Sequence, residues 1–323
     1  MYTGYKKVNR LQIYTNIVTL CCLTIKSVNF KQMTEIKQIE KIFPRPASPG
    51  MVGDGFRVYN YFPNGYPLRE KLSPFLMLDF NPAFDFGASG HPKGVGVHPH
   101  KGFETVTISY KGSVEHHDST GNTGVINPGD VQWMTAGAGI LHKEFHEKEF
   151  SKKGGPFEMI QLWVNLPKTY KLTPPKYQSL AASQINTAVL PGEGGMVRVI
   201  AGRFSDVKGS ASTFTEINVF DIRLNKDGEM IANIPPSHNT AMLVIEGSGL
   251  VNGQNAGPHN FVLFKNEGET ITIKAQEKSV LLLLSGVPIN EPIAQYGPFV
   301  MNTQQELQES FREFESGKFG VLH

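Results

Sequence analysis

The chain has 323 residues, of which 31 are basic and 29 acidic, and its formal net charge is +2. This length exceeds that of one typical hydrophobic core, so two domains are expected. The nearly balanced charge and the lack of a long single-sign run argue against direct nucleic-acid binding by bulk electrostatics. No apolar run approaches the roughly 20 residues that span a bilayer, so we predict no contact with a membrane.

The first 32 residues combine a basic start with a mildly apolar stretch, which is the outline of a secretory signal. Polar residues interrupt the stretch, and no small-x-small cleavage site follows it. Met33 then opens a segment that reads like an ordinary cytoplasmic N-terminus. We therefore expect residues 1–32 to be a disordered extension or a mis-assigned start, and the protein to be cytoplasmic. Cys21 and Cys22 lie here, which leaves residues 23–323 without a disulfide framework or a thiolate metal site.

From about Phe56 onward, short runs of β-type residues alternate with glycine, proline and asparagine. This pattern is typical of a mainly antiparallel β-sandwich or β-barrel. The predicted strands are 103–110, 159–166, 196–202, 214–224, 240–247, 261–264, 270–275 and 279–286.

The one well-marked helix is predicted over residues 302–320. Asn302 or Thr303 can cap its start, and Gly317 can end it. Leu307, Phe311 and Phe314 share one face of such a helix.

The sequence also contains an internal echo. "YKGSVEHH" followed by "NPGDVQWMTAG" corresponds to "IEGSGLVNG" followed by "NEGETITIKA". In each half a strand ends in Gly-Ser, and a turn of glycine plus an acidic residue follows, which indicates two related β domains in tandem. We predict an N-terminal domain over 33–166, a linker over 167–195 and a C-terminal domain over 196–323.

Candidate metal ligands lie in two clusters. On a strand, His98 and His100 point to the same side because successive side chains alternate. About forty residues later, His142 and Glu144 share a face in the same way. Three imidazoles and a carboxylate suit Fe²⁺, Mn²⁺, Ni²⁺, Cu²⁺ or Zn²⁺ and leave coordination positions open.

The residue pattern alone does not select the acidic ligand. By alternation Glu104 lies on the same face as His98 and His100, so it competes with Glu144. His146 competes with His142 in the same way.

Several separated motifs resemble the pirin family of the cupin superfamily. They agree in order over Phe43 to Gly320 and are HPHKGFET, NPGDVQWMTAGAGILHKE, QLWVNLP at 161–167 and EPIAQYGPFVMNT at 291–303. The resemblance implies an all-β fold of two tandem cupin-type β-barrels, a bicupin of jelly-roll type with a short C-terminal helix. It also implies one iron ion in the N-terminal barrel, held by three histidines and one glutamate.

Carried over by position, the implied metal ligands are His98, His100, His142 and Glu144. The resemblance thus selects Glu144 over Glu104, and Glu104 becomes a residue that orients a ligand imidazole. In the second half the matching positions are Asn233, Pro235, Leu281 and Leu283. Because apolar side chains cannot coordinate a metal, the C-terminal barrel is predicted to be metal-free, and His238 alone makes no site.

The remaining candidates have structural interpretations. His116 and His117 are expected on a solvated hairpin, and His91, His259 and His323 on the surface. Trp133 and Met134 are assigned to the core rather than to the cavity, whereas Phe103 fits either. Lys101 is expected at the rim of the pocket. Gly137 and Gly139 are expected to allow a sharp turn before His142.

The family resemblance implies a metal-dependent dioxygenase that acts on flavonols such as quercetin with O₂. Glu144 would serve as the catalytic base for the flavonol hydroxyl. The alternative is a redox-sensing regulatory protein that engages a protein partner, either as a transcription co-regulator or as a modulator of a metabolic enzyme. A third option is another cupin activity, because fold alone does not fix the substrate. With no coiled coil or long apolar edge visible, a monomer is predicted.

Overall fold

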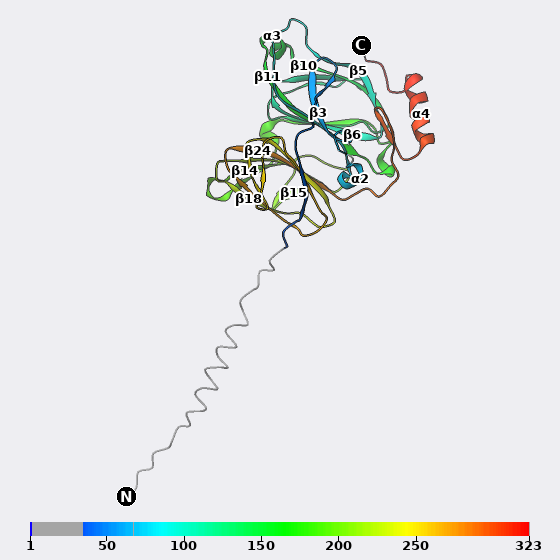
Figure 1. Ribbon diagram of the computed structural model, residues 1–323. Helices are drawn as coiled ribbons and strands as arrows, with labels where there is room; N and C mark the ends of the chain where they lie inside the picture. Colours follow the sequence, from blue (N-terminus) through cyan, green and yellow to red (C-terminus); the bar gives the residue numbers. More distant parts are fainter. Residues whose placement is uncertain (2–34, 67, 323) are drawn as a thin grey trace. The chain divides into compact units, whose positions relative to one another are not determined.

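The computed structural model describes residues 1, 35–66 and 68–322 (Figure 1). Residues 2–32 of the predicted extension, including both cysteines, and His323 lie outside the described residues. All helices and strands below belong to the unit Ile36–His323. Among the described residues, no helix is long and apolar enough to cross a membrane.

The first barrel consists of two antiparallel sheets. Its larger sheet has the order β12-β9-β6-β11-β4-β3-β2, and its smaller sheet has the order β5-β10-β7-β8. The strands are β2 (Gly50–Val52), β3 (Phe56–Phe62), β4 (Phe75–Phe86), β5 (Gly94–His100), β6 (Phe103–Lys111), β7 (Val114–Asp118), β8 (Thr123–Ile126), β9 (Val131–Thr135), β10 (Ile140–His146), β11 (Gly155–Asn165) and β12 (Lys176–Leu180).

The second barrel repeats this arrangement. Its larger sheet has the order β1-β22-β19-β24-β17-β14-β13, and its smaller sheet has the order β18-β23-β20-β21. The strands are β1 (Ile39–Phe43), β13 (Thr187–Leu190), β14 (Gly195–Ala201), β17 (Ile217–Leu224), β18 (Glu229–Asn233), β19 (Asn239–Glu246), β20 (Gly249–Val251), β21 (Gln254–Ala256), β22 (Phe261–Phe264), β23 (Thr270–Ala275) and β24 (Ser279–Gly286). The tandem β architecture expected from the internal echo is confirmed.

The other elements are short. They are the helices α2 (Arg69–Leu72), α3 (Lys148–Lys153) and α4 (Gln304–Glu315), the 3-10 turns η2 (Lys168–Tyr170), η3 (Ala182–Gln184) and η4 (Pro191–Glu193), and the hairpins β15 (Arg203–Phe204) with β16 (Val207–Lys208) and β25 (Ala294–Tyr296) with β26 (Phe299–Met301). The predicted C-terminal helix is confirmed as α4. Thr303 caps it, and Glu306 completes a capping box by reaching back to the backbone N–H of Thr303.

Every predicted strand is found, but strand pairing does not follow chain order strictly. Strand β1 pairs with β22 of the second barrel although it precedes the first barrel in the sequence. Strands β12 and β13 fall in the segment predicted as a linker, and they pair with β9 of the first barrel and β14 of the second. The domain boundaries 33–166, 167–195 and 196–323 stay predictions.

The largest hydrophobic cluster joins the two large sheets, and strand alternation explains why. On β11, Ile160, Leu162 and Val164 belong to this cluster together with Leu243 and Leu284 of the second barrel. The intervening side chains of β11 therefore point to the opposite face, into the first barrel. The side chains on that face include Met159, Gln161 and Trp163, which line a cavity in the first barrel.

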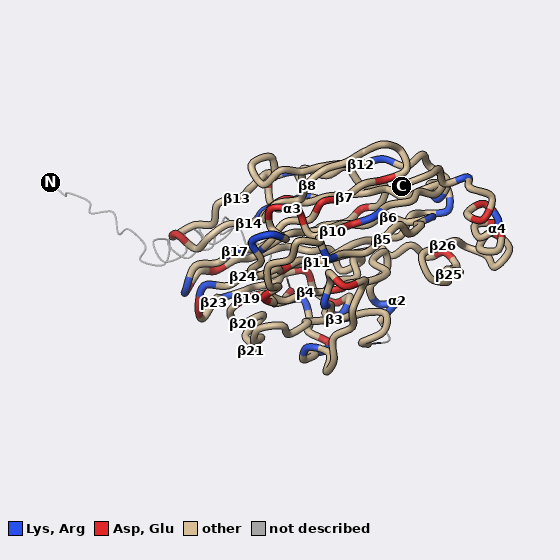
Figure 2. Tube along the Cα trace, turned by 90° about the horizontal axis from the view of Figure 1, so that it is seen from above, with Lys and Arg blue, Asp and Glu red and all other residues tan. Residues whose placement is uncertain are grey.

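A buried ion pair within the second barrel also contacts the first barrel. Arg198 on β14 lies 2.5 Å from Asp221 on β17, and the two side chains are 6% and 0% exposed. Arg198 also donates to the carbonyl of Gly129 in the first barrel. Elsewhere, basic and acidic residues are interspersed along the described chain (Figure 2).

Replacing Asp221 by Asn tests the importance of this pair. Because Arg198 would be left buried without its countercharge, we expect the free energy of unfolding to fall by about 3–5 kcal/mol. Urea denaturation of the metal-free protein measures the loss. Glu229→Gln, which removes an exposed ion pair with Lys274, is the control and should have no measurable effect. Equal losses in the two variants would contradict the prediction.

Candidate metal centre

The predicted histidines are brought together by the pairing of β5 with β10. His142 on β10 lies directly opposite His98 on β5, and Ile140 lies opposite His100. Along β10, the side chains of Ile140, His142, Glu144 and His146 are buried, whereas those between them are half-buried. The alternation expected from the sequence therefore places His142 inside the first barrel, facing both histidines of β5.

The three imidazoles converge on one point. One ring nitrogen from each of His98, His100 and His142 can be chosen so that all three lie within 4.8 Å of one another. The ring centroids are 4.9 Å apart for His98 and His100, 4.2 Å for His98 and His142, and 4.8 Å for His100 and His142. His100 and His142 are buried and His98 is half-buried. Such an arrangement can hold a single metal ion.

Glu144 lies in the same cavity but outside this group of three. A register irregularity between His142 and Glu144 places Glu144 opposite Val95. Its side chain is buried and lines the cavity together with His98 and His100. Its assignment as the fourth ligand stays a prediction.

The two competing candidates have other environments. Glu104 shares its face of β6 with Val106 and Ile108, which pack between the barrels, and one of its oxygens accepts from Thr135 at 2.7 Å. The expectation that Glu104 lies on the face of His98 and His100, where it could orient an imidazole, is wrong. The turn at Gly102, where φ is +87°, interrupts the alternation between β5 and β6.

His146 is held at the far end of β10. Its Nε2 hydrogen-bonds to the carbonyl oxygen of Gly55 at 2.9 Å. Its ring packs against Phe86 and Phe157, with centroids 4.7 Å away in each case. His146 is therefore held by this hydrogen bond and by ring packing, and it does not compete with His142 as a metal ligand.

Burial keeps the three imidazoles neutral. It lowers the pKa of His98, and together with the neighbouring histidines it lowers the pKa values of His100 and His142 well below the usual value. Neutral imidazoles are the form that binds metals. Burial also raises the pKa of Glu144 to about 7.

Unpartnered nitrogen atoms show that the residues fit a metal. In the structure, Nδ1 of His100 and both ring nitrogens of His142 are buried without a hydrogen-bond partner. Each such atom costs about 1–3 kcal/mol when left unsatisfied. In His98, Nδ1 hydrogen-bonds to the carbonyl of Gly96 at 2.8 Å, which leaves Nε2 available for a metal. Coordination would relieve part of this cost.

A cavity of about 360 Å³ opens beside the histidines. The side chains of β11 that point into the barrel, Met159, Gln161 and Trp163, form one wall together with Met77 and Asp79 of the neighbouring strand β4. Mostly apolar walls with a few polar groups are typical of pockets for small organic ligands. The mouth continues into an outer groove, which shares Met77 and Asp79 with the cavity.

Comparison with known proteins identifies the family. The model of the pirin family matches residues 55–164, and that of the pirin C-terminal cupin domain matches residues 219–320. The chain belongs to the pirin family. Its two barrels are accordingly cupin barrels, as the sequence motifs implied.

Individual pirin relatives agree with this. A protein of Pseudomonas aeruginosa, whose name assigns it provisionally to the quercetin 2,3-dioxygenases, is 44% identical over 84% of this chain and 95% of its own. Pirin of Rattus norvegicus is 36% identical over 79% of this chain and 86% of its own. The crystal structure of quercetin 2,3-dioxygenase from Acinetobacter baumannii is 46% identical, covers 89% of this chain and 100% of its own, and has a TM-score of 0.84.

Other residues considered in the sequence analysis of this pirin contribute to packing rather than to the cavity. Trp133 and Met134 are fully buried and do not line the cavity, which confirms their assignment to the core. Phe103 is also fully buried and packs against both His100 and Trp163. The expectation that Lys101 lies at the rim is wrong, because its side chain is buried against helix α4.

His116 lies in the interior of the first barrel, which the sequence analysis did not predict. The expectation of a solvated hairpin fails for it, because it is 3% exposed and lies opposite Glu144 on the neighbouring strand. Its ring stacks on Tyr177 at 5.1 Å, and burial lowers its pKa to about 4. The sequence did contain a signal for this: if Val114 points inward on the strand "VEHHD", alternation places His116 inward as well. His117 points outward and pairs with Glu115.

In the second barrel, none of the four positions that match the ligands is a histidine or an acidic residue. Leu281 and Leu283 are buried in its apolar core, and Asn233 and Pro235 are exposed. His238 is buried but contacts Ser285 and Glu216. His91 is exposed as expected, whereas His259 is half-buried and contacts Arg45. A metal-free second barrel stays a prediction.

Removing one ligand imidazole should abolish metal binding. We expect the metal-free protein to take up one Co²⁺ ion per chain, and His142→Ala to lose this ion at micromolar metal. Equilibrium dialysis followed by elemental analysis measures the stoichiometry. His117→Ala, which removes an outward-facing histidine, is the matched control and should bind like the wild type. Two ions per wild-type chain would contradict the assignment of a single site.

Asp79 should make stability depend on pH. Burial raises its pKa in the folded protein from 3.8 to about 6. The folded state then holds the proton more tightly than the unfolded state, so the free energy of unfolding should fall as the pH rises from about 4 to about 6. Asp79→Asn removes the contribution of this carboxyl group and should gain roughly 2 kcal/mol relative to the wild type over that interval. Urea denaturation at several pH values measures it, and parallel curves for both proteins would refute it.

Proposed function

We propose that this pirin is a mononuclear metal-dependent dioxygenase that cleaves flavonols such as quercetin, with Fe²⁺ as its metal. The observation that carries the proposal is the convergence of His98, His100 and His142 beside a mostly apolar cavity of about 360 Å³. The relatives named for quercetin 2,3-dioxygenase activity support the substrate class. Because the donors are borderline nitrogen and oxygen atoms, Mn²⁺, Ni²⁺, Cu²⁺ and Zn²⁺ suit the same residues.

The cavity walls favour a flat aromatic substrate. Met77, Met159 and Trp163 offer apolar and aromatic surface to its rings, while Asp79 and Gln161 offer hydrogen bonds to its hydroxyl groups. A substrate held in this way presents its hydroxyl and carbonyl oxygens to the three histidines. Positioning of this kind lowers the entropy cost of the reaction.

Glu144 is proposed as both the fourth metal ligand and the catalytic base. Its buried carboxylate lines the cavity and can accept the proton of the flavonol 3-hydroxyl group. When bound, the metal supplies Lewis acidity that stabilises the resulting anion. In the overall reaction, O₂ is consumed, the oxygen-containing ring opens, carbon monoxide is released and a depside remains.

Oxygen consumption by the iron-loaded protein with quercetin tests the proposal. The wild type should consume O₂ and release carbon monoxide in equal amounts. His98→Ala should lose this activity, and Glu144→Gln at saturating metal should lower kcat by about 100-fold or more. His117→Ala should retain full activity. An anaerobic spectrum of the iron protein that does not shift on addition of quercetin would contradict the proposal.

A metal-loaded protein that binds a partner yet turns over no flavonol would favour the redox-sensing regulatory alternative. That role requires a change from Fe²⁺ to Fe³⁺ within the barrel and no turnover. The cytoplasmic location and the monomeric state expected from the sequence remain predictions.

A further inference from the structure

The C-terminal segment, defined here as residues 291–320, contacts the chain immediately after the ligand His100. The backbone N–H of Lys101 donates to the carbonyl of Pro298 at 3.2 Å, and the carbonyl of Lys101 accepts from the N–H of Val300 at 3.0 Å. Pro298 also lines the metal cavity. The end of strand β5 is therefore held by β26 and the turn before it.

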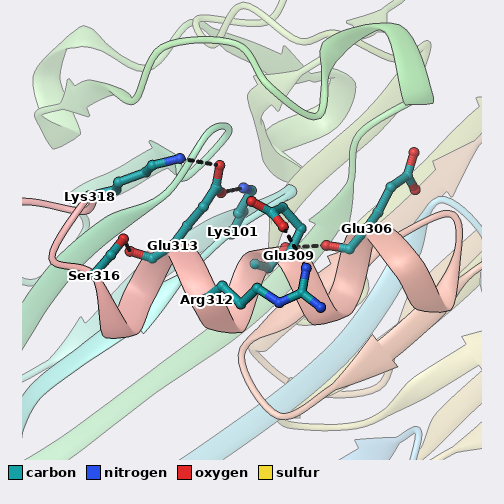
Figure 3. Close-up of polar contacts among 8 residues, drawn as sticks. Lys101, Glu306, Glu309, Arg312, Glu313, Ser316 and Lys318 are labelled. Carbon is teal, nitrogen blue, oxygen red and sulfur yellow. Dashed lines mark hydrogen bonds and ion pairs between the residues drawn. The ribbon is translucent and has the colours of Figure 1, made fainter.

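The side chain of Lys101 extends this contact to helix α4. Its ammonium group pairs with the carboxylate of Glu313, 212 residues away in the chain (Figure 3). The side chain of Lys101 is 4% exposed and that of Glu313 is 20% exposed. Because a buried ammonium group is costly without a countercharge, Lys101 is held against the helix. The ring of Phe319 lies 5.7 Å from the same ammonium group.

Lys171 holds the turn at Gly102, which follows Lys101. Buried Lys171 donates to the carbonyls of Gly102 and Val300 at 2.9 Å each, and to the side chain of Asn165 at 2.8 Å. A Cβ atom at Gly102 would lie 2.0 Å from the carbonyl oxygen of Val300. The turn and β26 therefore touch without room for a side chain.

The same segment reaches the strand that carries His142. Phe319 packs on Gly139, where an added Cβ atom would lie 2.3 Å from its ring. Ser119 donates to the carbonyl of Phe319 at 2.5 Å and accepts from the N–H of Leu141 at 3.1 Å. One C-terminal segment thus contacts both strands, β5 and β10, that bring the histidines together.

We propose that Lys101 is a positioning residue: through its ion pair with Glu313, helix α4 fixes His100 relative to His98 and His142 and so raises the affinity of the site for metal. The inference rests on the proposed metal site. It makes the C-terminal helix part of the metal centre although the helix supplies no ligand.

The alternative is that the pair only stabilises the fold. In that case removal of the ion pair would lower the stability of the metal-free protein but would leave the metal affinity and the ligand geometry of the folded protein unchanged. Metal affinity and the visible spectrum of bound Co²⁺ distinguish the two, because the spectrum reports ligand geometry directly.

The test is a Co²⁺ titration of the full-length metal-free protein. Glu313→Gln should raise the Kd for Co²⁺ by about 10-fold, the lower end of the range for residues that orient ligands, and should change the visible bands. Lys101→Arg keeps the charge that pairs with Glu313 and should retain most of the wild-type affinity. Glu309→Gln is the matched control: it removes an exposed ion pair with Arg312 on the same helix and should bind Co²⁺ like the wild type (Figure 3).

The double variant Lys101→Met with Glu313→Gln removes the buried charge along with its partner, so it folds without an unpaired ammonium group. It should show the same loss of affinity as Glu313→Gln. Wild-type affinity and spectrum in the double variant would overturn the proposal. If the wild type binds no Co²⁺, the proposed function itself fails, and the two failures are therefore distinguishable.

Discussion

The first barrel brings three imidazole rings together and leaves buried nitrogen atoms of two of them, His100 and His142, without partners, and this is the constraint on which the rest of the structure depends. Neutral imidazole needs both a donor and an acceptor partner when it is removed from water. Nδ1 of His98 finds its partner in the carbonyl of Gly96, but His100 and His142 leave nitrogens unsatisfied. A shared metal ion would satisfy these nitrogen atoms.

The two barrels differ in what fills their interiors: the second has an apolar core, and the first contains the histidines and the cavity. The large sheets pack face to face and form the main core, with strand β11 contributing Ile160 and Leu162. The second barrel fills its own interior with apolar side chains such as Leu281 and Leu283. Because stability is supplied there and between the barrels, the first barrel can keep a cavity and polar groups in its interior.

The candidate metal centre is contacted by parts of the chain that are far from it in sequence. Strand β5 ends at His100 and passes at once into a buried turn held by Lys171, β26 and α4. Strand β10 starts against Phe319 of the same C-terminal segment. The C-terminal segment therefore contacts both strands that bring the three histidines together.

The sequence by itself determined the strands and the two related β domains, because alternation and turn residues are local properties. Its pattern offered His98, His100 and His142 but left His146 open, and the family resemblance selected His142. The pattern placed His98 with His100 and His142 with Glu144 correctly on shared faces. It failed at Glu104, because Gly102 takes a positive φ and ends the alternation between β5 and β6. It also failed at His116 and Lys101, whose burial depends on strands and a helix distant in the chain. Only the tertiary structure decided these, since strand pairing and helix docking depend on contacts that no local pattern encodes.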